Sequence, residues 1–327
     1  MPHDRIGLLL AGGTGSRLFP ATRALSKQLL PVYDKPMVYY PLSVLMQAGL
    51  REIVLITTPQ DAGTYRRLLG TGARFGITLH YVLQAQARGV AEAVTLMAEA
   101  VGMRPCLMVL GDNLFLGDTP IPALAGLDPG TSHARLFTKA VADPRAFGVL
   151  GLDETGQPRT IVEKPERPAS NLAITGLYAL PADASDRVAR QHPSERGELE
   201  ITCLLRSYLD DGRLQSAALG PDVTWLDTGT HDNLLAAAQL VRDRQRRTGQ
   251  PMAAPELIAY RNGWIDAEAL TDLARSMQKT EYGQSLLRYL AAEATPPCAV
   301  PQSRITAMPK HLPAPTGTQS GSLSVQW

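Results

Sequence analysis

Short apolar runs alternate with longer helix-like segments through the first third of the chain. Residues 6–10, 53–57 and 106–110 are almost wholly apolar and have about the length of buried strands. Residues 37–48 and 89–101, which lie between such runs, have the length and apolar content of helices. Because strands that alternate with helices form parallel sheets, this pattern predicts an α/β fold whose mainly parallel sheet has helices on both faces.

After residue 131 the pattern changes to strands that are separated by turns. Residues 148–153 and 158–163 flank a short turn and predict a hairpin. A long helix is expected over residues 231–246. We therefore expect a small β subregion beside the main sheet, followed by helices.

The C-terminal part of the chain consists of two segments that differ in composition. Residues 251–293 predict a small helical module. Residues 294–327 are rich in Pro, Ser, Thr and Gly, which is typical of a disordered tail. The core of the protein is therefore expected over residues 1–250.

Composition narrows the class of protein. The chain has 327 residues, of which 44% are hydrophobic and 19% are charged, as in globular proteins. A formal net charge of +1 gives no electrostatic reason to expect nucleic acid or a membrane surface as a partner. No apolar stretch approaches the roughly 20 residues that span a bilayer, and the first strand begins too early for a signal peptide. Cys106, Cys203 and Cys298 match no zinc spacing, so we expect a reducing, cytoplasmic location.

A glycine-rich turn follows the first strand. Residues 11–17 read Ala-Gly-Gly-Thr-Gly-Ser-Arg, and the cations Arg17 and Lys27 lie in the same segment. Glycines let a ligand approach the backbone closely, so this segment predicts a phosphate site. It is neither a P-loop nor a dinucleotide fingerprint, since Leu18 stands where the third glycine of the fingerprint would be. The alternative is a surface turn whose cations are merely solvated.

Two acids follow apolar strands, Asp112 after residues 106–110 and Asp227 after residues 223–226. If both strand ends face one cleft, their carboxylates could share a Mg²⁺ ion whose other ligands are phosphate oxygens and water. The alternative is that each acid caps the turn or helix that follows it. Glu163 and Lys164 form a further pair at a strand end, suited to sugar hydroxyls and a phosphate, or else to a surface ion pair.

These motifs together resemble the sugar-1-phosphate nucleotidyltransferase family, and within it the glucose-1-phosphate thymidylyltransferase branch. The matching strings occur in the family's order between about residue 6 and residue 290. They lie at residues 10–20, 26–31, 33–37, 58–61, 110–113, 163–165, 175–178, 196–202 and 225–230.

The resemblance implies a Rossmann-like, GT-A-like nucleotidyltransferase fold. Residues up to about 130 would bind the nucleotide, and residues from about 131 to 230 the sugar phosphate. The implied reaction is Mg²⁺-dependent transfer of a dTMP group from dTTP to glucose-1-phosphate, which gives dTDP-glucose and pyrophosphate for deoxysugar biosynthesis. A cytoplasmic homotetramer without nucleic-acid or membrane partners is also implied.

The resemblance also implies roles for individual residues. Arg17 would hold the triphosphate and stabilise the leaving pyrophosphate, and Lys27 would contact the α-phosphate. Asp112, which counts among the catalytic residues, and Asp227 would hold Mg²⁺. Nucleotide contacts are implied for Leu10, Ala11, Gly12, Gly13, Thr14, Gly15, Gln84 and Gly89. Sugar-phosphate contacts are implied for Asn113, Gly148, Glu163, Lys164, Asn171 and Tyr178.

The chain departs from the family's usual pattern in several places. The base-binding segment 84–93 lacks two usual prolines and carries Arg88 where an acid is common. Phe147 stands where a tyrosine is usual, and residues 116–118 read Leu-Gly-Asp in place of Tyr-Gly-His near a regulatory nucleotide site. The base, the sugar and any feedback regulation therefore stay open. The alternatives are a relative that uses UTP or another sugar-1-phosphate, or a non-catalytic nucleotide-sugar-binding regulator.

Overall fold

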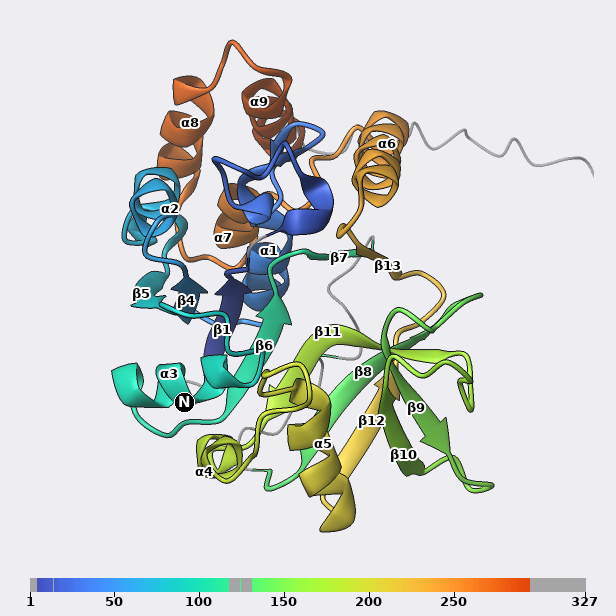
Figure 1. The fold of residues 1–327 in the computed structure, drawn as a ribbon. Helices are drawn as coiled ribbons and strands as arrows, with labels where there is room; N and C mark the ends of the chain where they lie inside the picture. The colour runs from blue at the N-terminus through green and yellow to red at the C-terminus, as the bar shows by residue number, and fades with distance from the viewer. Residues whose placement is uncertain (1–4, 14, 118–123, 125–130, 295–327) are drawn as a thin grey trace, which may run out of the picture.

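One large sheet organises the part of the chain that the structure describes, residues 5–13, 15–117, 124 and 131–294 (Figure 1). In these residues the computed structural model has a nine-stranded sheet of order β10-β9-β11-β6-β1-β4-β5, with β8 beside β11 and β12 beside β8. Its strands are β1 (Ile6–Ala11), β4 (Glu52–Thr57), β5 (Thr78–Leu83), β6 (Cys106–Leu110), β8 (Ala134–Ala140), β9 (Gly148–Leu152), β10 (Pro158–Glu163), β11 (Leu172–Leu180) and β12 (Leu214–Ala218). The predicted tail, beyond residue 294, lies outside the described residues.

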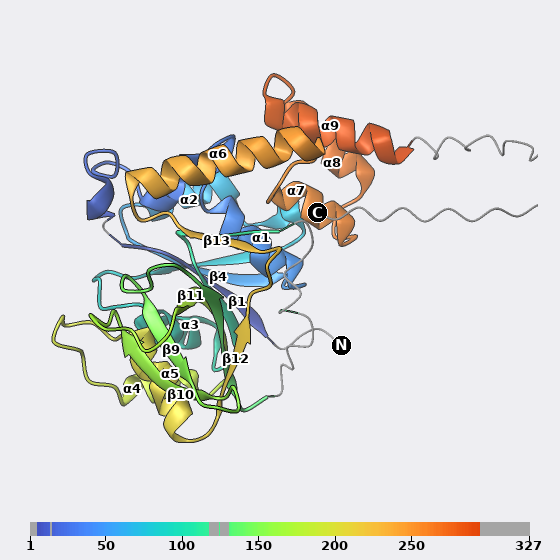
Figure 2. The same cartoon turned by 90° about the vertical axis from the view of Figure 1, so that its right-hand side faces the viewer.

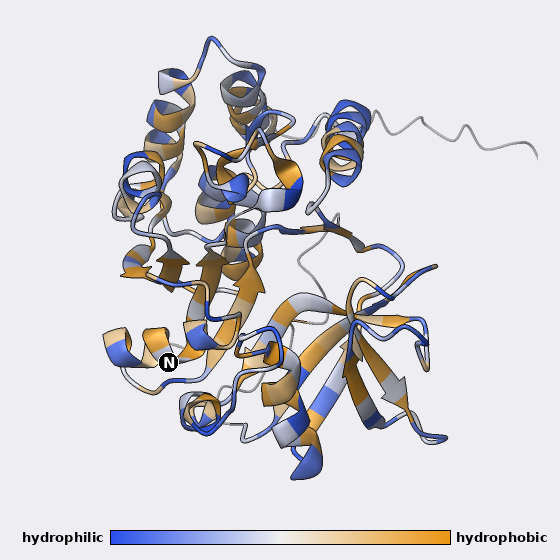
Figure 3. Cartoon of the chain, viewed as in Figure 1, coloured by the Kyte–Doolittle hydropathy of each residue, from blue (hydrophilic) through white to orange (hydrophobic). Residues whose placement is uncertain are grey.

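The parallel half of the sheet consists of β6, β1, β4 and β5, and helices cover both of its faces. Successive residues of β1 point to opposite faces, so Leu9 joins one apolar cluster while Leu8 and Leu10 join the other. The first cluster includes α1 (Tyr39–Gln47), α2 (Ala62–Leu69) and α7 (Pro255–Arg261). The second includes α3 (Glu92–Val101), α4 (Ala184–Ala189) and α5 (Ile201–Asp210). The predicted fold class is confirmed, and Figure 3 shows the strands of this half as largely hydrophobic ribbon.

The other half of the sheet is mainly antiparallel. The predicted hairpin is present as β9 and β10, and β11 pairs antiparallel with β6. A separate two-stranded sheet pairs β7 (Asn113–Leu116) with β13 (Thr224–Asp227), so that Asp227 lies opposite Asn113. The sequence did not predict β7, because its few residues follow the preceding strand after one short turn. A third small sheet joins β2 (Pro31–Val32) to β3 (Lys35–Pro36).

The C-terminal helices are α6 (His231–Thr248), α7, α8 (Ala267–Ser276) and α9 (Glu281–Ala294). Figures 1 and 2 show α6 at the end of the molecule away from α4 and α5. Helices α7 to α9 pack around their own apolar cluster, which includes Leu257 and Leu286. Within the described residues, no helix has both the length and the apolar character needed to cross a membrane.

Candidate active site

The glycine-rich loop follows β1, and buried polar side chains donate hydrogen bonds to its backbone carbonyl groups. The Tyr65 hydroxyl donates to the carbonyl oxygen of Ala11 at 3.3 Å, and Gln28 Nε2 donates to that of Gly12 at 3.2 Å. Tyr65 and Gln28 are both buried. Gly13 has a φ of 106°, a backbone conformation that favours glycine. The loop is therefore tied to the protein through its carbonyl groups, while its outer side borders a cavity.

This cavity has a volume of about 620 Å³ and is the first of two at the strand ends. Leu10, Gly12, Gly13, Gln84 and Gly89 line it, as the resemblance implied for a nucleotide site. Among the described residues, Ala11 and Gly15 are not part of the lining, and Thr14 lies outside the described residues. The lining also includes residues that were not singled out from the sequence, among them Phe19, Arg23, Gln60, Gln86 and Glu198.

Residues 84–93, which the resemblance implies for base binding, are held in place without the usual prolines. Leu199 N donates to the Arg88 carbonyl at 2.7 Å, and the Leu199 carbonyl accepts from Ala91 N at 3.0 Å. Gly89 is required here, because an added Cβ would lie 2.5 Å from the Leu199 carbonyl oxygen. The exposed Arg88 side chain lies 3.9 Å from the carboxylate of Glu92. Two backbone hydrogen bonds to Leu199 thus hold this segment against the chain that precedes α5.

Asp112 and Asp227 line a second cavity of about 180 Å³, so the structure brings the two predicted acids together. Asp112 follows β6, Asp227 ends β13, and the pairing of β13 with β7 sets Asp227 next to the segment that begins at Asn113. The ammonium group of Lys27 pairs with Asp112 Oδ2. The guanidinium of Arg17 lies against Gly229, where an added Cβ would collide with Arg17 Nη2. Both predicted cations therefore lie beside the acid pair.

The two carboxylates differ in their electrostatic surroundings. Burial raises the pKa of Asp227, and the charge of Asp112 raises it further against the opposing effect of Lys27 and Arg17. Burial would also raise the pKa of Asp112, but the charge of Lys27 and the hydrogen bonds from Lys27 and Asn113 outweigh it and hold the pKa below its ordinary value. Lys27 and Arg17 therefore compensate the negative charge of the site only in part, and Asp227 is the less compensated of the two acids.

This charge suits a divalent cation. No group of three or more His, Cys, Asp or Glu side chains that could hold a metal occurs in the described part of the chain. Mg²⁺ is commonly bound by one or two carboxylates together with phosphate oxygens and water. Asp112 and Asp227 fit that donor set, with the remaining ligands left to a substrate.

Most of the residues that the resemblance implies for sugar-phosphate contacts line the same cavity as the acids. Gly148, Glu163, Lys164 and Tyr178 are part of its wall, as is Asn113. An added Cβ at Gly148 would lie 3.0 Å from Thr202 Cγ2 and 3.4 Å from Glu163 Oε2, so a side chain here would push on its neighbours. Lys164 has a φ of 43°, a strained value for a residue with a side chain.

Asn171 is the exception among the predicted sugar-phosphate residues. It is exposed at the start of β11, and its carbonyl accepts from Val141 N at 3.0 Å. Within the described residues it is not part of the wall of the cavity. Its implied sugar contact stays a prediction.

Several residues of the site were not identified from the sequence. Trp225 and Thr202 line the second cavity, beside Phe147, which the sequence had already marked as a departure from the family pattern. Arg196 lies 2.8 Å from Glu200 and 3.6 Å from Glu163. Arg196 and Thr202 belong to the matched string 196–202 and Trp225 to the string 225–230, so motif matches were the available signal.

The two cavities adjoin each other. Val90 lines both of them. Leu10, in the first cavity, and Leu110, in the second, are direct partners in the pairing of β1 with β6. The cavities therefore open at the carboxyl ends of neighbouring parallel strands, where ligands bind in open α/β sheets.

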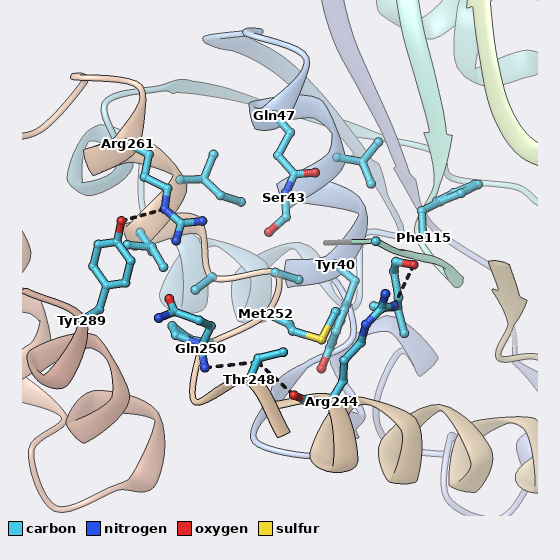
Figure 4. Close-up of a pocket in the computed structure, with 18 residues that line it drawn as sticks. Tyr40, Ser43, Gln47, Phe115, Arg244, Thr248, Gln250, Met252, Arg261 and Tyr289 are labelled. Atoms are coloured by element: carbon cyan, nitrogen blue, oxygen red, sulfur yellow. Dashed lines mark hydrogen bonds between the residues drawn. The ribbon is translucent and has the colours of Figure 1, made fainter. Parts of the chain in front are cut away.

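A third cavity, of about 330 Å³, lies between α1, α6 and α7 and shares no described lining residue with the other two (Figure 4). Tyr40, Ser43 and Arg261 line it, together with Leu116 and Gly117 from the Leu-Gly-Asp departure. Arg244 Nη1 donates to the Leu116 carbonyl at 3.2 Å. Asp118, the third residue of that departure, lies outside the described residues.

A parallel sheet with a phosphate-suited loop, an acid pair and two cations at its strand ends defines a phosphoryl-handling α/β protein. Comparison with known proteins makes this class specific. Residues 6–244 match the family model described as Nucleotidyl transferase. A glucose-1-phosphate thymidylyltransferase of Xanthomonas campestris pv. campestris is 48% identical over 283 residues, which cover 86% of this chain and 96% of the relative. One of Mycobacterium tuberculosis is 45% identical over 284 residues, which cover 87% and 98%.

Solved structures agree with these relatives. A Bacillus anthracis structure, described as a candidate glucose-1-phosphate thymidylyltransferase in complex with sucrose, has a TM-score of 0.67 and 37% identity, covering 72% of this chain and 95% of that one. A UDP-glucose pyrophosphorylase complexed with UDP-glucose shares the fold, with a TM-score of 0.65 at 24% identity, covering 73% and 99%. The chain therefore belongs to the nucleotidyl transferase family and, within it, to the branch of the glucose-1-phosphate thymidylyltransferases.

Proposed function

We propose that the chain transfers a thymidylyl group from dTTP to glucose-1-phosphate, giving dTDP-glucose and pyrophosphate. The observation that carries the proposal is the position of the acid pair and its cations where a larger and a smaller cavity adjoin. The larger one would hold the nucleotide and the smaller one the sugar phosphate. The names of the relatives at 45% to 48% identity support the choice of substrates.

The chemistry is displacement at phosphorus. An oxygen of the sugar phosphate attacks the α-phosphorus of dTTP, and the bond from that phosphorus to the β-phosphate oxygen breaks as pyrophosphate leaves. The nucleophile is already anionic, so no general base is needed. Arg17 would neutralise the leaving pyrophosphate, and Lys27 the charge at the α-phosphate. Mg²⁺ held by Asp112 and Asp227 would supply further neutralisation of the phosphate oxygens.

Gln84 supports a pyrimidine with a ring N–H, such as thymine or uracil. Its Nε2 donates to the Gly89 carbonyl at 3.2 Å and to Glu92 Oε2 at 2.7 Å. A carbonyl and a carboxylate can only accept, so the Gln84 oxygen is the atom left for a ligand. That oxygen lies beside Gly12, 3.4 Å from where a Cβ would be. It could accept the N3–H of thymine or uracil, whereas cytosine offers no donor at that ring position.

Product identification tests the proposal. The protein is incubated with dTTP, glucose-1-phosphate and Mg²⁺, and the products are followed by ³¹P NMR and mass spectrometry. Appearance of dTDP-glucose together with pyrophosphate is expected. Absence of any nucleotide sugar from dTTP or UTP with several sugar-1-phosphates would leave the non-catalytic regulator as the better account.

Three further parts of the proposal concern the whole protein. They are a nucleotide-binding part up to about residue 130 followed by a sugar-phosphate-binding part, a homotetramer, and a cytoplasmic location. Light scattering on the purified chain tests the tetramer, and fractionation of the cell that makes it tests the location. Separate nucleotide and sugar-phosphate footprints in hydrogen exchange would test the division.

A further inference from the structure

The side chain of Asn113 connects the indole of Trp225 to the carboxylate of Asp112. Trp225 Nε1 donates to Asn113 Oδ1 at 2.6 Å, and the backbone N–H of Gly176 donates to the same oxygen at 3.2 Å. On its other side, Asn113 Nδ2 donates to Asp112 Oδ1 at 3.1 Å. Asn113 thus joins β13 and β11 to one of the two acids of the site.

These hydrogen bonds determine which way round the Asn113 amide lies. An indole N–H and a backbone N–H can only donate, so the atom that faces Trp225 and Gly176 must be the oxygen. The NH₂ group must then face Asp112. A reversed amide would set its NH₂ against two donors and its oxygen against a carboxylate, at the cost of buried unpaired polar groups. Trp225 and Gly176 therefore orient the donor that Asp112 receives.

The packing leaves this arrangement little freedom. Asn113 is 5% exposed and Trp225 is 9% exposed. A Cβ at Gly176 would lie 2.7 Å from the side-chain carbon of Asn113, so the strand approaches the amide as closely as a glycine permits. The ring of Phe147 packs on Trp225 with centroids 4.9 Å apart. Pairing of β13 with β7 holds Trp225 opposite Phe115.

Both oxygens of Asp112 are consequently held by the protein. Oδ1 accepts from Asn113, Oδ2 pairs with Lys27, and the Asp112 backbone carbonyl accepts from Thr228 Oγ1 at 2.7 Å. Lys27 reaches Asp112 on a long side chain with many rotamers, whereas the Asn113 amide is held by Trp225 and Gly176. The Asn113 contact is therefore the one that keeps the Asp112 carboxylate in the cavity that it shares with Asp227.

We infer that Trp225 is a positioning residue that acts through Asn113 to hold the Asp112 carboxylate ready for a divalent cation. The inference rests on the proposed function, in which that cation binds between Asp112 and Asp227. In addition to its implied contact with the sugar, Asn113 would orient the carboxylate of Asp112. The competing view is that Trp225 is only an aromatic wall of the sugar-phosphate cavity.

Direct cation binding separates these views, because it needs no turnover. Binding of Mn²⁺ alone is measured by electron paramagnetic resonance on the full chain. Trp225→Phe keeps a ring against Phe147 and removes the indole donor. Its Kd for Mn²⁺ is expected to rise about three- to tenfold, less than the roughly 10–100-fold for direct partners of metal ligands because Trp225 acts through Asn113. Trp264→Phe, the matched control outside the described lining of the two substrate cavities, leaves the Kd unchanged.

A double-mutant cycle tests whether Trp225 acts through Asn113. Asn113→Ala weakens Mn²⁺ binding by about tenfold or more, and Trp225→Phe adds no further loss in that background. Two outcomes overturn the inference: an unchanged Kd with a raised KM for the sugar phosphate in Trp225→Phe, or additive losses in the double variant. Failure of the wild-type protein to bind Mn²⁺ would instead count against the proposed cation site itself.

A measurement on the wild-type protein decides the matter if Trp225→Phe does not fold. In protein labelled with ¹⁵N-tryptophan, the indole N–H resonance of Trp225 is expected to shift when Mg²⁺ is added. The reason is that Trp225 donates to Asn113, and the Asn113 amide donates to Asp112, the expected ligand of the cation. The resonance of Trp264 stays in place. The resonances of Trp225 and Trp264 are assigned from the signals that disappear in the variants Trp264→Phe and Trp327→Phe. An unmoved Trp225 resonance at saturating Mg²⁺ overturns the inference.

Discussion

The ammonium group of Lys27 pairs with the carboxylate of Asp112, although 85 positions separate them in the sequence. The pair joins the segment after the glycine-rich loop to the end of β6, where the two cavities adjoin. Lys27, which is expected to contact the α-phosphate of the nucleotide, thus neutralises Asp112, which is expected to hold the cation. Binding of a cation and a phosphate would exchange this internal pair for pairs with the substrate.

Lys27→Met tests the electrostatic side of this pair. Lys27 helps to hold the pKa of Asp112 below its ordinary value against the effect of burial, so the pair stabilises the fold above the pKa of an unfolded Asp, about 4. In the variant, burial raises the pKa of Asp112, and its unpaired carboxylate takes up a proton as the pH falls. Without cations, the loss of unfolding free energy is therefore expected to be largest near neutral pH and to shrink toward about pH 4. A loss independent of pH would contradict the pairing; Lys27→Met combined with Asp112→Asn is the control.

Arg17 is expected to matter for turnover and not for folding. The residue is exposed, and its guanidinium lies against Gly229 beside the acids. Arg17→Ala should lower kcat by about 10²–10³, the usual loss for a donor that stabilises developing charge. Pyrophosphate release gives the rate. Arg67→Ala removes the same charge from the exposed face of α2 and should leave kcat unchanged; near-normal turnover in Arg17→Ala would rule out the leaving-group role.

Asp227→Asn should stabilise the cation-free protein while abolishing turnover. Burial and the neighbouring Asp112 raise the pKa of Asp227, so the folded state binds its proton more tightly than the unfolded state does. The ionised form therefore costs stability, fully so above the raised pKa. Near neutral pH in EDTA, the Tm of the variant should rise by roughly 2–4 °C for each kcal/mol relieved. Mg²⁺ should raise the Tm of the wild type and not that of the variant; a lower Tm in EDTA would show that Asp227 is not strained.

Gly148→Ala should weaken binding of the sugar phosphate selectively. The added Cβ would press on Thr202 and the carboxylate of Glu163. Overpacking usually costs about 1–3 kcal/mol, and a loss of about 1.4 kcal/mol from binding of the sugar phosphate would raise its KM roughly tenfold. The KM for dTTP should not change. Gly220→Ala, where an added Cβ meets nothing within 4 Å, is the control, and an equal rise in both KM values would argue for general damage to the fold.

The sequence located the strand ends that carry the site because apolar runs mark buried strands directly. Asp112 and Asp227 could be singled out in this way, as could Arg17 and Lys27 from the loop. The strand β7 could not, because it is only four residues long and pairs with β13, more than a hundred positions later. That pairing is what brings the two acids together.

Contacts between distant side chains were likewise beyond sequence reasoning. The hydrogen bond from Trp225 to Asn113 spans 112 positions and leaves no periodic signal. Residues 196–202 matched a motif, but only the structure sets Arg196 beside Glu163 and Leu199 against the base-binding segment. The exposed position of Asn171 shows the converse, because a residue can be implied by resemblance and yet lie outside the described wall of the cavity.

We expect the two cavities to serve a thymidylyl transfer onto glucose-1-phosphate. Initial rates of pyrophosphate release test it when dTTP, UTP, CTP and GTP are each combined with several sugar-1-phosphates. We expect the highest kcat/KM for dTTP with glucose-1-phosphate, and a far lower value for CTP because cytosine has no N3–H to donate to Gln84. A strong preference for UTP would contradict the thymidylyl assignment, and no release with any pair would contradict the enzyme.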